Sequence, residues 1–219
     1  MRNKGNHIRR RIVRGGVAAL IAVGLLWGAA LPDRAQADPI SDSDRAKIGE
    51  IVHLPAELPE IRKDGKAAAL PLAKMGQGKI LALFCFSEQC GVTYYYKQRL
   101  RQIVEDFKAQ GVVFVGVRCG KREKPDEPLQ LAEANYLTMP FADDAAGDLV
   151  RYFGVRQSLT FEVVDREGRL RYRGAFDDNA DEKKVKTKYL RNALNQVIAG
   201  RPVTATQGKA LGCAILPIK

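Results

Sequence analysis

Two uninterrupted apolar runs, separated by one amphipathic segment, constrain the fold of this chain more than any other feature. The runs occupy residues 79–86 and 112–117, and within them apolar and polar residues do not alternate. Strands of this kind are typical of parallel sheets that helices cover on both faces. The segment between the runs repeats its apolar residues at the spacing of one helix face: Tyr96, Leu100, Ile103 and Phe107. The pattern predicts a strand–helix–strand unit with parallel strands.

The rest of the chain supplies the other parts of an α/β domain. An Asp-Gly turn within residues 61–66 joins two short extended pieces ahead of the core. A polar loop over residues 118–128 leads into a helix through residues 129–134. Further on, we expect a short strand at 139–141, a helix at 145–153, a hairpin of 160–165 with 170–174, and a last helix at 182–199. These elements predict a central mixed β-sheet flanked by helices.

Cys90 stands where the first buried strand has ended and the amphipathic helix begins. In such sheets, functional residues usually lie at the carboxyl ends of the parallel strands. Cys119, just past the second strand, should lie on the same edge of the sheet as Cys90. Backbone N–H groups at the start of a helix stabilise a thiolate and lower the pKa of a cysteine there. The position of Cys90 therefore predicts a reactive thiol.

The first 37 residues have the pattern of an export signal. A basic stretch ending at Arg14 precedes an apolar segment over residues 15–31, and Ala35-Gln36-Ala37 is a small-x-small cleavage site. The run Arg9-Arg10-Arg11 also fits the twin-arginine pattern, so either the general secretory or the twin-arginine route is open. A retained anchor is the alternative, although the apolar segment is shorter than the ~20 residues that span a bilayer. We predict a periplasmic or extracellular protein, which contacts a membrane only if the signal stays uncleaved.

Composition excludes several functional classes. The signal holds seven of the 36 basic and one of the 25 acidic residues, which leaves a net charge of +5 on the remainder. No basic stripe interleaved with aromatic residues is present, which argues against nucleic-acid binding. His53 is the only histidine after residue 37, which argues against a histidine-rich metal site and a Cys–His hydrolytic pair. We expect no metal and no cofactor.

Four cysteines, namely Cys85, Cys90, Cys119 and Cys213, lie beyond the predicted signal. In an oxidising compartment they allow two disulfides with three connectivities. Cys85 sits inside an apolar strand, where an inert role in the core is one interpretation. Simple structural bridging, or free buried thiols at Cys85 and Cys119, is the alternative to redox chemistry.

Several short motifs, in this order and spacing, resemble the thioredoxin-fold redoxins, a group with peroxiredoxin-like (AhpC-TSA-like) exported members. Residues 165–174 read Asp-x-x-Gly-x-x-x-Tyr-x-Gly, the pattern of the family's hairpin. The other matching pieces are Asp64-Gly65-Lys66, the strand–Cys90–helix unit, Gln110-Gly111, Asp177-Asp178-Asn179 and Gly212-Cys213-Ala214-Ile215. The resemblance implies a thioredoxin-like fold. We predict a signal at 1–37, a lead-in at 38–57 and a redoxin domain at 58–219.

The expected active site departs from the family pattern. The family's Cys-x-x-Cys motif is incomplete, because Thr93 or Ser87 stands where a second cysteine is expected beside Cys90. The resemblance then implies Cys119 or Cys213 as the resolving thiol, with Cys85 as the least favoured partner. Leu159 occupies the place of the family's cis-proline, for which we expect a trans bond and a rearranged loop.

Two functional hypotheses follow. The first is an exported thiol–disulfide oxidoreductase or peroxiredoxin-like antioxidant protein that uses Cys90 on a redox partner protein, a small disulfide or a peroxide. For peroxide chemistry, Ser87 has the expected spacing from Cys90, and Arg156 is a candidate for stabilising the thiolate. The second hypothesis is a non-catalytic thioredoxin-fold module with structural disulfides and a role in partner binding.

Overall fold

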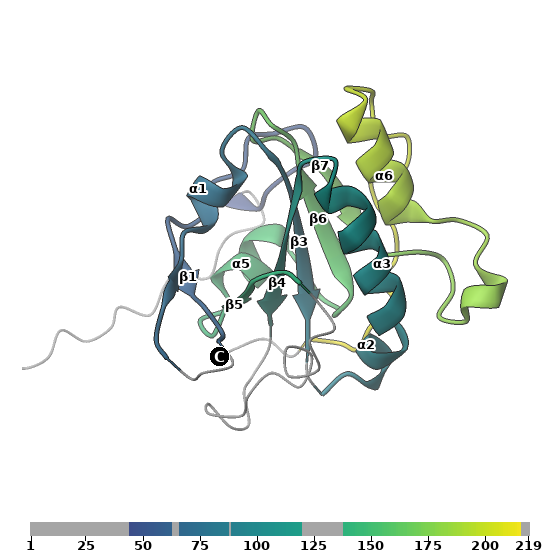
Figure 1. Ribbon diagram of the computed structural model, residues 1–219, viewed down its shortest axis with the longest axis horizontal. Coiled ribbons are helices and arrows are strands. Elements are labelled where there is room, and N and C mark those ends of the chain that lie inside the picture. The colour runs from purple at the N-terminus through teal and green to yellow at the C-terminus, as the bar shows by residue number, and fades with distance from the viewer. Residues whose placement is uncertain (1–43, 63–65, 88, 120–137, 216–219) are drawn as a thin grey trace, which may run out of the picture. The chain divides into compact units, whose positions relative to one another are not determined.

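A five-stranded mixed sheet forms the centre of the protein in a computed structural model that describes residues 44–62, 66–87, 89–119 and 138–215. The strands lie in the order β5-β4-β3-β6-β7 (Figure 1). β3, β4 and β5 are parallel, whereas β6 and β7 are antiparallel to their neighbours. Their bounds are β3 Ile80–Phe86, β4 Val112–Arg118, β5 Phe141–Asp143, β6 Thr160–Val164 and β7 Leu170–Gly174. The predicted mixed sheet and its closing hairpin are confirmed.

Helices cover both faces of this sheet, which explains why the central strands show no alternation. α3 (Lys97–Lys108) and α6 (Tyr189–Ile198) pack on one face, and α5 (Asp148–Phe153) packs on the other (Figure 1). Alternate residues of β3 enter the two cores: Ile80, Ala82, Phe84 and Phe86 face α3 and α6, while Leu81, Leu83 and Cys85 face α5. Burial of both faces makes β3 and β4 apolar throughout.

The helix that follows Cys90 is divided into two pieces. α2 spans Gly91–Tyr95, Tyr96 interrupts it, and α3 begins at Lys97. Tyr96 keeps helical backbone angles (φ −88°, ψ −6°), so the two pieces follow each other directly. The sequence pattern predicted a single helix here. α3 ends at Lys108, and Gly111, three residues later, has a positive φ (81°).

The last helix begins later than its sequence indicates. Residues 182–199 predict one helix, but Glu182–Lys184 form only a short 3-10 turn and α6 begins at Tyr189. The carboxylate of Asp178 accepts hydrogen bonds from the backbone N–H groups of Lys186 (2.9 Å) and Thr187 (3.0 Å). Because this side chain binds N–H groups that a continuous helix would use, the segment before Tyr189 stays extended.

The residues ahead of β3 form a short pair of strands and a short helix. β1 (Leu58–Pro59) pairs antiparallel with β2 (Ala69–Leu70), as the predicted extended pieces require, and α1 (Leu72–Gly76), which was not predicted, follows. The centre of the turn expected within residues 61–66, the helix through 129–134 and the signal at 1–37 lie outside the described residues. No helix within the described ranges is long and apolar enough to cross a membrane.

Candidate functional site

Cys90 forms a disulfide with Cys213 at the carboxyl end of β3. Cys90 is the residue immediately before α2 and is completely buried, whereas Cys213 is exposed. Their Cα atoms are 5.6 Å apart, although the residues are separated by 123 positions in the sequence. Of the two predicted resolving thiols, the structure therefore places Cys213 against Cys90.

Residues 211–215, which we call the C-terminal tail, are held at this place by backbone pairing. The tail lies antiparallel to residues 156–158 through a bridge between Gln157 and Ala214. Ser158 N–H donates to the Cys213 carbonyl (2.9 Å), and Ile215 N–H donates to the Arg156 carbonyl (2.9 Å). The tail thus adds a short strand beside the segment that leads into β6.

The backbone N–H of Cys213 points at the disulfide itself. It lies 3.2 Å from Cys90 Sγ and 3.0 Å from Ser158 Oγ, so the buried Ser158 hydroxyl also orients the tail. Gly212 permits this close approach, because a Cβ atom at that position would collide with the Ser158 carbonyl oxygen. The position of Cys213 is fixed by its neighbours as well as by its bond to Cys90.

Leu159 connects this site to the second disulfide. Its φ of 58° is the only positive φ at a non-glycine position among the described residues, and such angles are strained for a branched side chain. Leu159 N–H donates to the Cys85 carbonyl (2.8 Å), and Thr160 Oγ1 donates to the Gln157 carbonyl (2.7 Å). The loop at Leu159 lies between the two cysteine pairs, and its expected rearrangement with a trans bond stays a prediction.

Cys85 and Cys119 form the second disulfide, with Cα atoms 6.0 Å apart. Both residues are 3% exposed and belong to the core that faces α5. Cys119 N–H continues the sheet ladder by donating to the Phe86 carbonyl (2.9 Å). Cys119 shares the sheet edge with Cys90, as predicted, but its sulfur is bonded to Cys85.

The predicted hydroxyls and the predicted arginine take different places around Cys90. Thr93 is completely buried in α2, and its Oγ1 has no hydrogen-bond partner within the described residues. Ser87 accepts the N–H of Cys90 with its backbone carbonyl (3.2 Å). Arg156 is exposed and contacts the tail through its backbone carbonyl.

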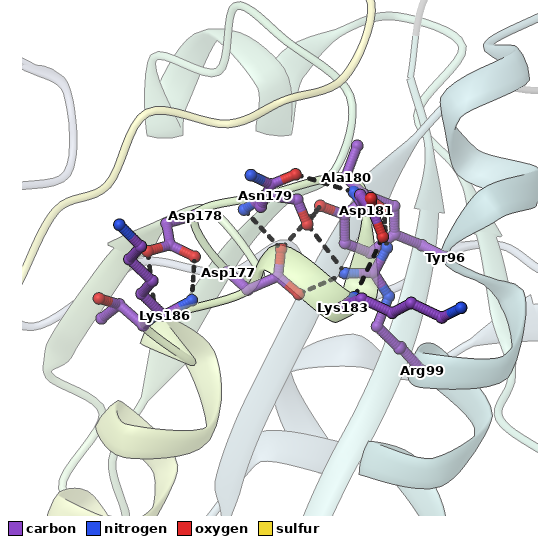
Figure 2. A network of polar contacts seen from close by, with 10 residues as sticks. Tyr96, Arg99, Asp177, Asp178, Asn179, Ala180, Asp181, Lys183 and Lys186 are labelled. Carbon is purple, nitrogen blue, oxygen red and sulfur yellow. Dashed lines mark hydrogen bonds and ion pairs between the residues drawn. The ribbon is translucent and has the colours of Figure 1, made fainter.

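A buried polar network, drawn in Figure 2, fixes the helix that follows Cys90. The Asp177 carboxylate accepts from Tyr96 Oη (2.7 Å) and pairs with Arg99 (2.6 Å). Arg99 also donates to the carbonyls of Asn179 (3.1 Å) and Ala180 (2.6 Å). Burial, together with the Asp177 carboxylate, raises the pKa of the Tyr96 phenol well above its usual value. The network ties the α2–α3 junction to the loop after β7.

Sequence reasoning noted Asp177-Asp178-Asn179 without giving it a role. The available signal was the position of two acids shortly after the hairpin and directly after Phe176, where a buried charge needs a partner. That partner, Arg99, lies on a helix 78 residues earlier in the chain. Within the described ranges, no group of three or more histidine, cysteine or acidic side chains is arranged to hold a metal ion.

Comparisons with known proteins agree with this architecture. A model of the AhpC/TSA family matches residues 55–173. An uncharacterized conserved protein from Geobacillus kaustophilus superimposes with a TM-score of 0.68 at 21% identity, over 78% of this chain and 93% of that one. A hypothetical protein from Sinorhizobium meliloti gives 0.65 at 26% identity, over 77% and 93%.

A third structure carries a functional description of its own. It comes from Chlorobium tepidum, is described as a thiol:disulfide interchange protein DsbE, and gives a TM-score of 0.50 at 18% identity over 71% of this chain and 97% of that one. At that identity the likeness shows the fold, which is thioredoxin-like. No curated protein matches the sequence.

Proposed function

The chain belongs to the AhpC/TSA family, and from this we propose that Cys90 and Cys213 are the redox centre of an exported thiol–disulfide oxidoreductase. The observation that carries the proposal is the tail, which bonds Cys213 to Cys90, the cysteine between the end of β3 and the start of α2. The two bonded residues are 123 positions apart in the sequence. The tail brings them together by pairing with residues 156–158, the segment that leads into β6.

The exposure of the two residues suggests the order of events. Cys213 is exposed and Cys90 is buried, so a thiolate of a substrate dithiol reaches the sulfur of Cys213 first. Attack there forms a mixed disulfide with Cys213 and releases Cys90 as a thiolate, next to the first N–H groups of α2. The second substrate thiolate then displaces Cys213. Two electrons and two protons have moved from the substrate to the pair, and the reverse sequence reduces a substrate disulfide.

Peroxide reduction is the second candidate function, favoured by the Ser87 hydroxyl three residues before Cys90. In the reduced protein, the Cys90 thiolate attacks a hydroperoxide, which leaves a sulfenic acid on Cys90 and releases an alcohol or water. The Cys213 thiol then attacks the sulfenic sulfur, forming the observed disulfide and a second water. The non-catalytic alternative is favoured by the complete burial of Cys90 beneath the tail.

The proposal includes the site of action. The basic and apolar pattern over residues 1–37 and the presence of two disulfides support export to the periplasm or the extracellular space. There the protein exchanges electrons with a redox partner protein or with small disulfide or peroxide substrates. The redoxin domain extends over residues 58–219 and follows the lead-in at 38–57.

The test compares Cys90→Ser and Cys213→Ser with the wild type, all without residues 1–37. Reduction of insulin disulfides and consumption of a hydroperoxide are measured, and circular dichroism verifies that each variant is folded. We expect both reactions that the wild type performs to fall to background in Cys90→Ser. In Cys90→Ser, a mixed disulfide should accumulate on Cys213, and in Cys213→Ser, a sulfenic acid should accumulate on Cys90 when a hydroperoxide is added; both are detectable by mass spectrometry. Equal rates in the wild type and in folded Cys90→Ser contradict the proposal and favour a non-catalytic module.

A further inference from the structure

The buried disulfide shares a cavity with a carboxylic acid. Cys85, Cys119 and Glu162 line a cavity of about 10 Å³, together with apolar side chains from β3, β4 and α5. Its two cysteines and its apolar side chains belong to the core that α5 covers. α3 and α6 lie on the opposite face of the sheet (Figure 1).

Glu162 is the unusual member of this group. It stands in β6 between Leu83 of β3 and Arg173 of β7, and its side chain is 2% exposed. Its Oε1 has no hydrogen-bond partner among the described residues. A buried carboxyl without a partner costs free energy, and an apolar residue of similar size would be more stable at this position.

The surroundings of Glu162 keep its proton bound near neutral pH. Burial raises the pKa of this carboxyl to about 8, and the nearby Arg173 guanidinium opposes the shift. Arg173 also donates to the Ala46 carbonyl (2.6 Å), and Arg45 and Tyr152 are further ionisable groups near its guanidinium. Glu162 can therefore give up a proton in the pH range in which thiols exchange with disulfides.

Cys119 also has a hydrogen-bond acceptor for the thiol that reduction would create. Cys119 Sγ lies 3.1 Å from the Val117 carbonyl oxygen, which can accept a hydrogen bond from the thiol once the disulfide is reduced. A disulfide that serves only as a cross-link needs neither an acid in its cavity nor an acceptor for a thiol proton.

We propose that Cys85, Cys119 and Glu162 form a second redox centre, in which Glu162 donates a proton to the thiolate that leaves when a dithiol reduces the buried disulfide. A reductant thiolate attacks one sulfur and the other cysteine departs, taking the proton of Glu162. The second reductant thiol then displaces the first cysteine and forms the reductant's own disulfide. The attacking thiol has released its proton to solvent, and Glu162 regains a proton from solvent. The second reductant thiol gives its proton to the cysteine that it displaces, so Cys85 and Cys119 each end with one proton.

The test follows the two disulfides separately in one sample. The folded protein is treated with dithiothreitol at pH values from 6 to 9, samples are alkylated, and peptide mass spectrometry gives a reduction rate for each pair. The rate for Cys85–Cys119 is divided by the rate for Cys90–Cys213. This ratio does not depend on the thiolate fraction of the reductant, because that fraction enters both rates. We expect Glu162→Gln to lower the rate for Cys85–Cys119 by about 100-fold at pH 7, as loss of an acid catalyst does. In the wild type the ratio falls above pH 8, whereas in Glu162→Gln it does not change with pH.

Two further variants make the result decisive. Glu167→Gln removes an exposed acid from the neighbouring hairpin and should leave the ratio and its pH profile unchanged. Glu162→Asp keeps a carboxyl and should keep a fall of the ratio with pH, even if Glu162→Gln does not fold. The proposal is overturned if the wild-type ratio is flat across this pH range, or if Glu162→Gln has the wild-type rate. Reduction of Cys85–Cys119 only when circular dichroism shows unfolding also overturns it. These outcomes are independent of the proposed function at Cys90.

Discussion

The two disulfides of this protein join cysteines in very different surroundings. Cys85–Cys119 links two neighbouring parallel strands, spans 34 residues of sequence and is buried on both sides. Cys90–Cys213 spans 123 residues and depends on a terminal segment held by a few backbone hydrogen bonds. One bond is embedded in the sheet and the other lies at its edge, although both meet the loop at Ser158 and Leu159. Under the two proposals, Cys90–Cys213 at the edge exchanges with substrates, while reduction of the buried Cys85–Cys119 depends on the proton of Glu162.

Removing each disulfide in turn gives the largest expected effect on stability. In the loop-closure treatment, a cross-link over 34 residues contributes about 4 kcal/mol and one over 123 residues about 5 kcal/mol to the free energy of unfolding. We expect Cys90→Ala/Cys213→Ala and Cys85→Ala/Cys119→Ala to lose amounts of this size in chemical denaturation. The second variant also leaves a cavity in the core, which adds about 1 kcal/mol or more.

Hydrogen exchange separates the two losses by location. Only removal of Cys90–Cys213 should speed exchange at the amides of Cys213 and Ile215, which the tail hydrogen bonds protect. Equal local protection in both double-alanine variants would mean that the tail stays docked without its covalent bond, and the contrast between edge and core would be lost.

The next largest effect is the pH dependence of stability that Glu162, beside the buried disulfide, should cause. Since burial raises the pKa of Glu162 to about 8, this acid is protonated in the native state while the unfolded chain loses the proton at a lower pH. Between these two pKa values the native protein binds more protons than the unfolded protein. The contribution of Glu162 to the free energy of unfolding is therefore fully present below about pH 4.5 and is lost as the pH rises to about 8. The loss should be as large as about 1.4 kcal/mol per pH unit.

Thermal or urea unfolding of wild type and Glu162→Gln between pH 5 and 9 checks this sign. The variant should lack the decline that Glu162 causes, so that the two stability curves converge toward low pH and separate toward high pH. Parallel curves would show that Glu162 is ionised in the native state.

On the side of Cys90, loss of one hydroxyl tests the network that holds its helix. Tyr96→Phe removes the hydrogen bond to Asp177 (2.7 Å) and leaves a buried carboxylate with one donor fewer. We expect a loss of about 1–2 kcal/mol in the free energy of unfolding. The matched control is Tyr95→Phe, because Tyr95 is 79% exposed and its hydroxyl should contribute almost nothing. Equal effects of the two substitutions would argue against a structural role for the network.

The smallest effect should come from one methyl group in the tail. Gly212→Ala places a Cβ against the Ser158 carbonyl and should push the tail away from the sheet edge. The Cys90–Cys213 bond should then be reduced about tenfold faster by dithiothreitol, which corresponds to about 1.4 kcal/mol, while Cys85–Cys119 keeps its rate. Gly91→Ala is the control, since a Cβ there meets no atom within 4 Å. A matching acceleration in Gly91→Ala would show that the tail contacts are unimportant.

Local sequence patterns were sufficient for much of this fold and for the place of Cys90. The two apolar runs predict β3 and β4, and the hairpin pattern predicts β6 and β7, because each pattern reports burial of the residues that carry it. The start of α6 was wrong, since a side chain from outside the segment, Asp178, competes for its N–H groups.

The partner of Cys90 could not be predicted in the same way. Cys213 meets Cys90 through contacts with Ser158 and Arg156, and no local pattern in the tail describes those contacts. Leu159 likewise carries no local signal for its left-handed backbone, which its neighbours impose. Glu162 did leave a signal, because it is the one acid in β6. Such an acid is either buried together with its apolar neighbours or lies on a solvent-exposed face of the strand. Because β6 lies between β3 and β7 in the sheet, all its residues are buried, and Glu162 is buried with them.

The order of the cysteines along the chain has a consequence for biogenesis. A polypeptide is made and emerges from its amino end, so Cys85, Cys90 and Cys119 appear long before Cys213. The buried bond can form as soon as β4 is complete, but Cys90 must wait for almost the entire chain. During that interval it is a solitary thiol with two nearby cysteines to mispair with. Early closure of Cys85–Cys119 removes both competitors and keeps Cys90 available for the last cysteine to arrive.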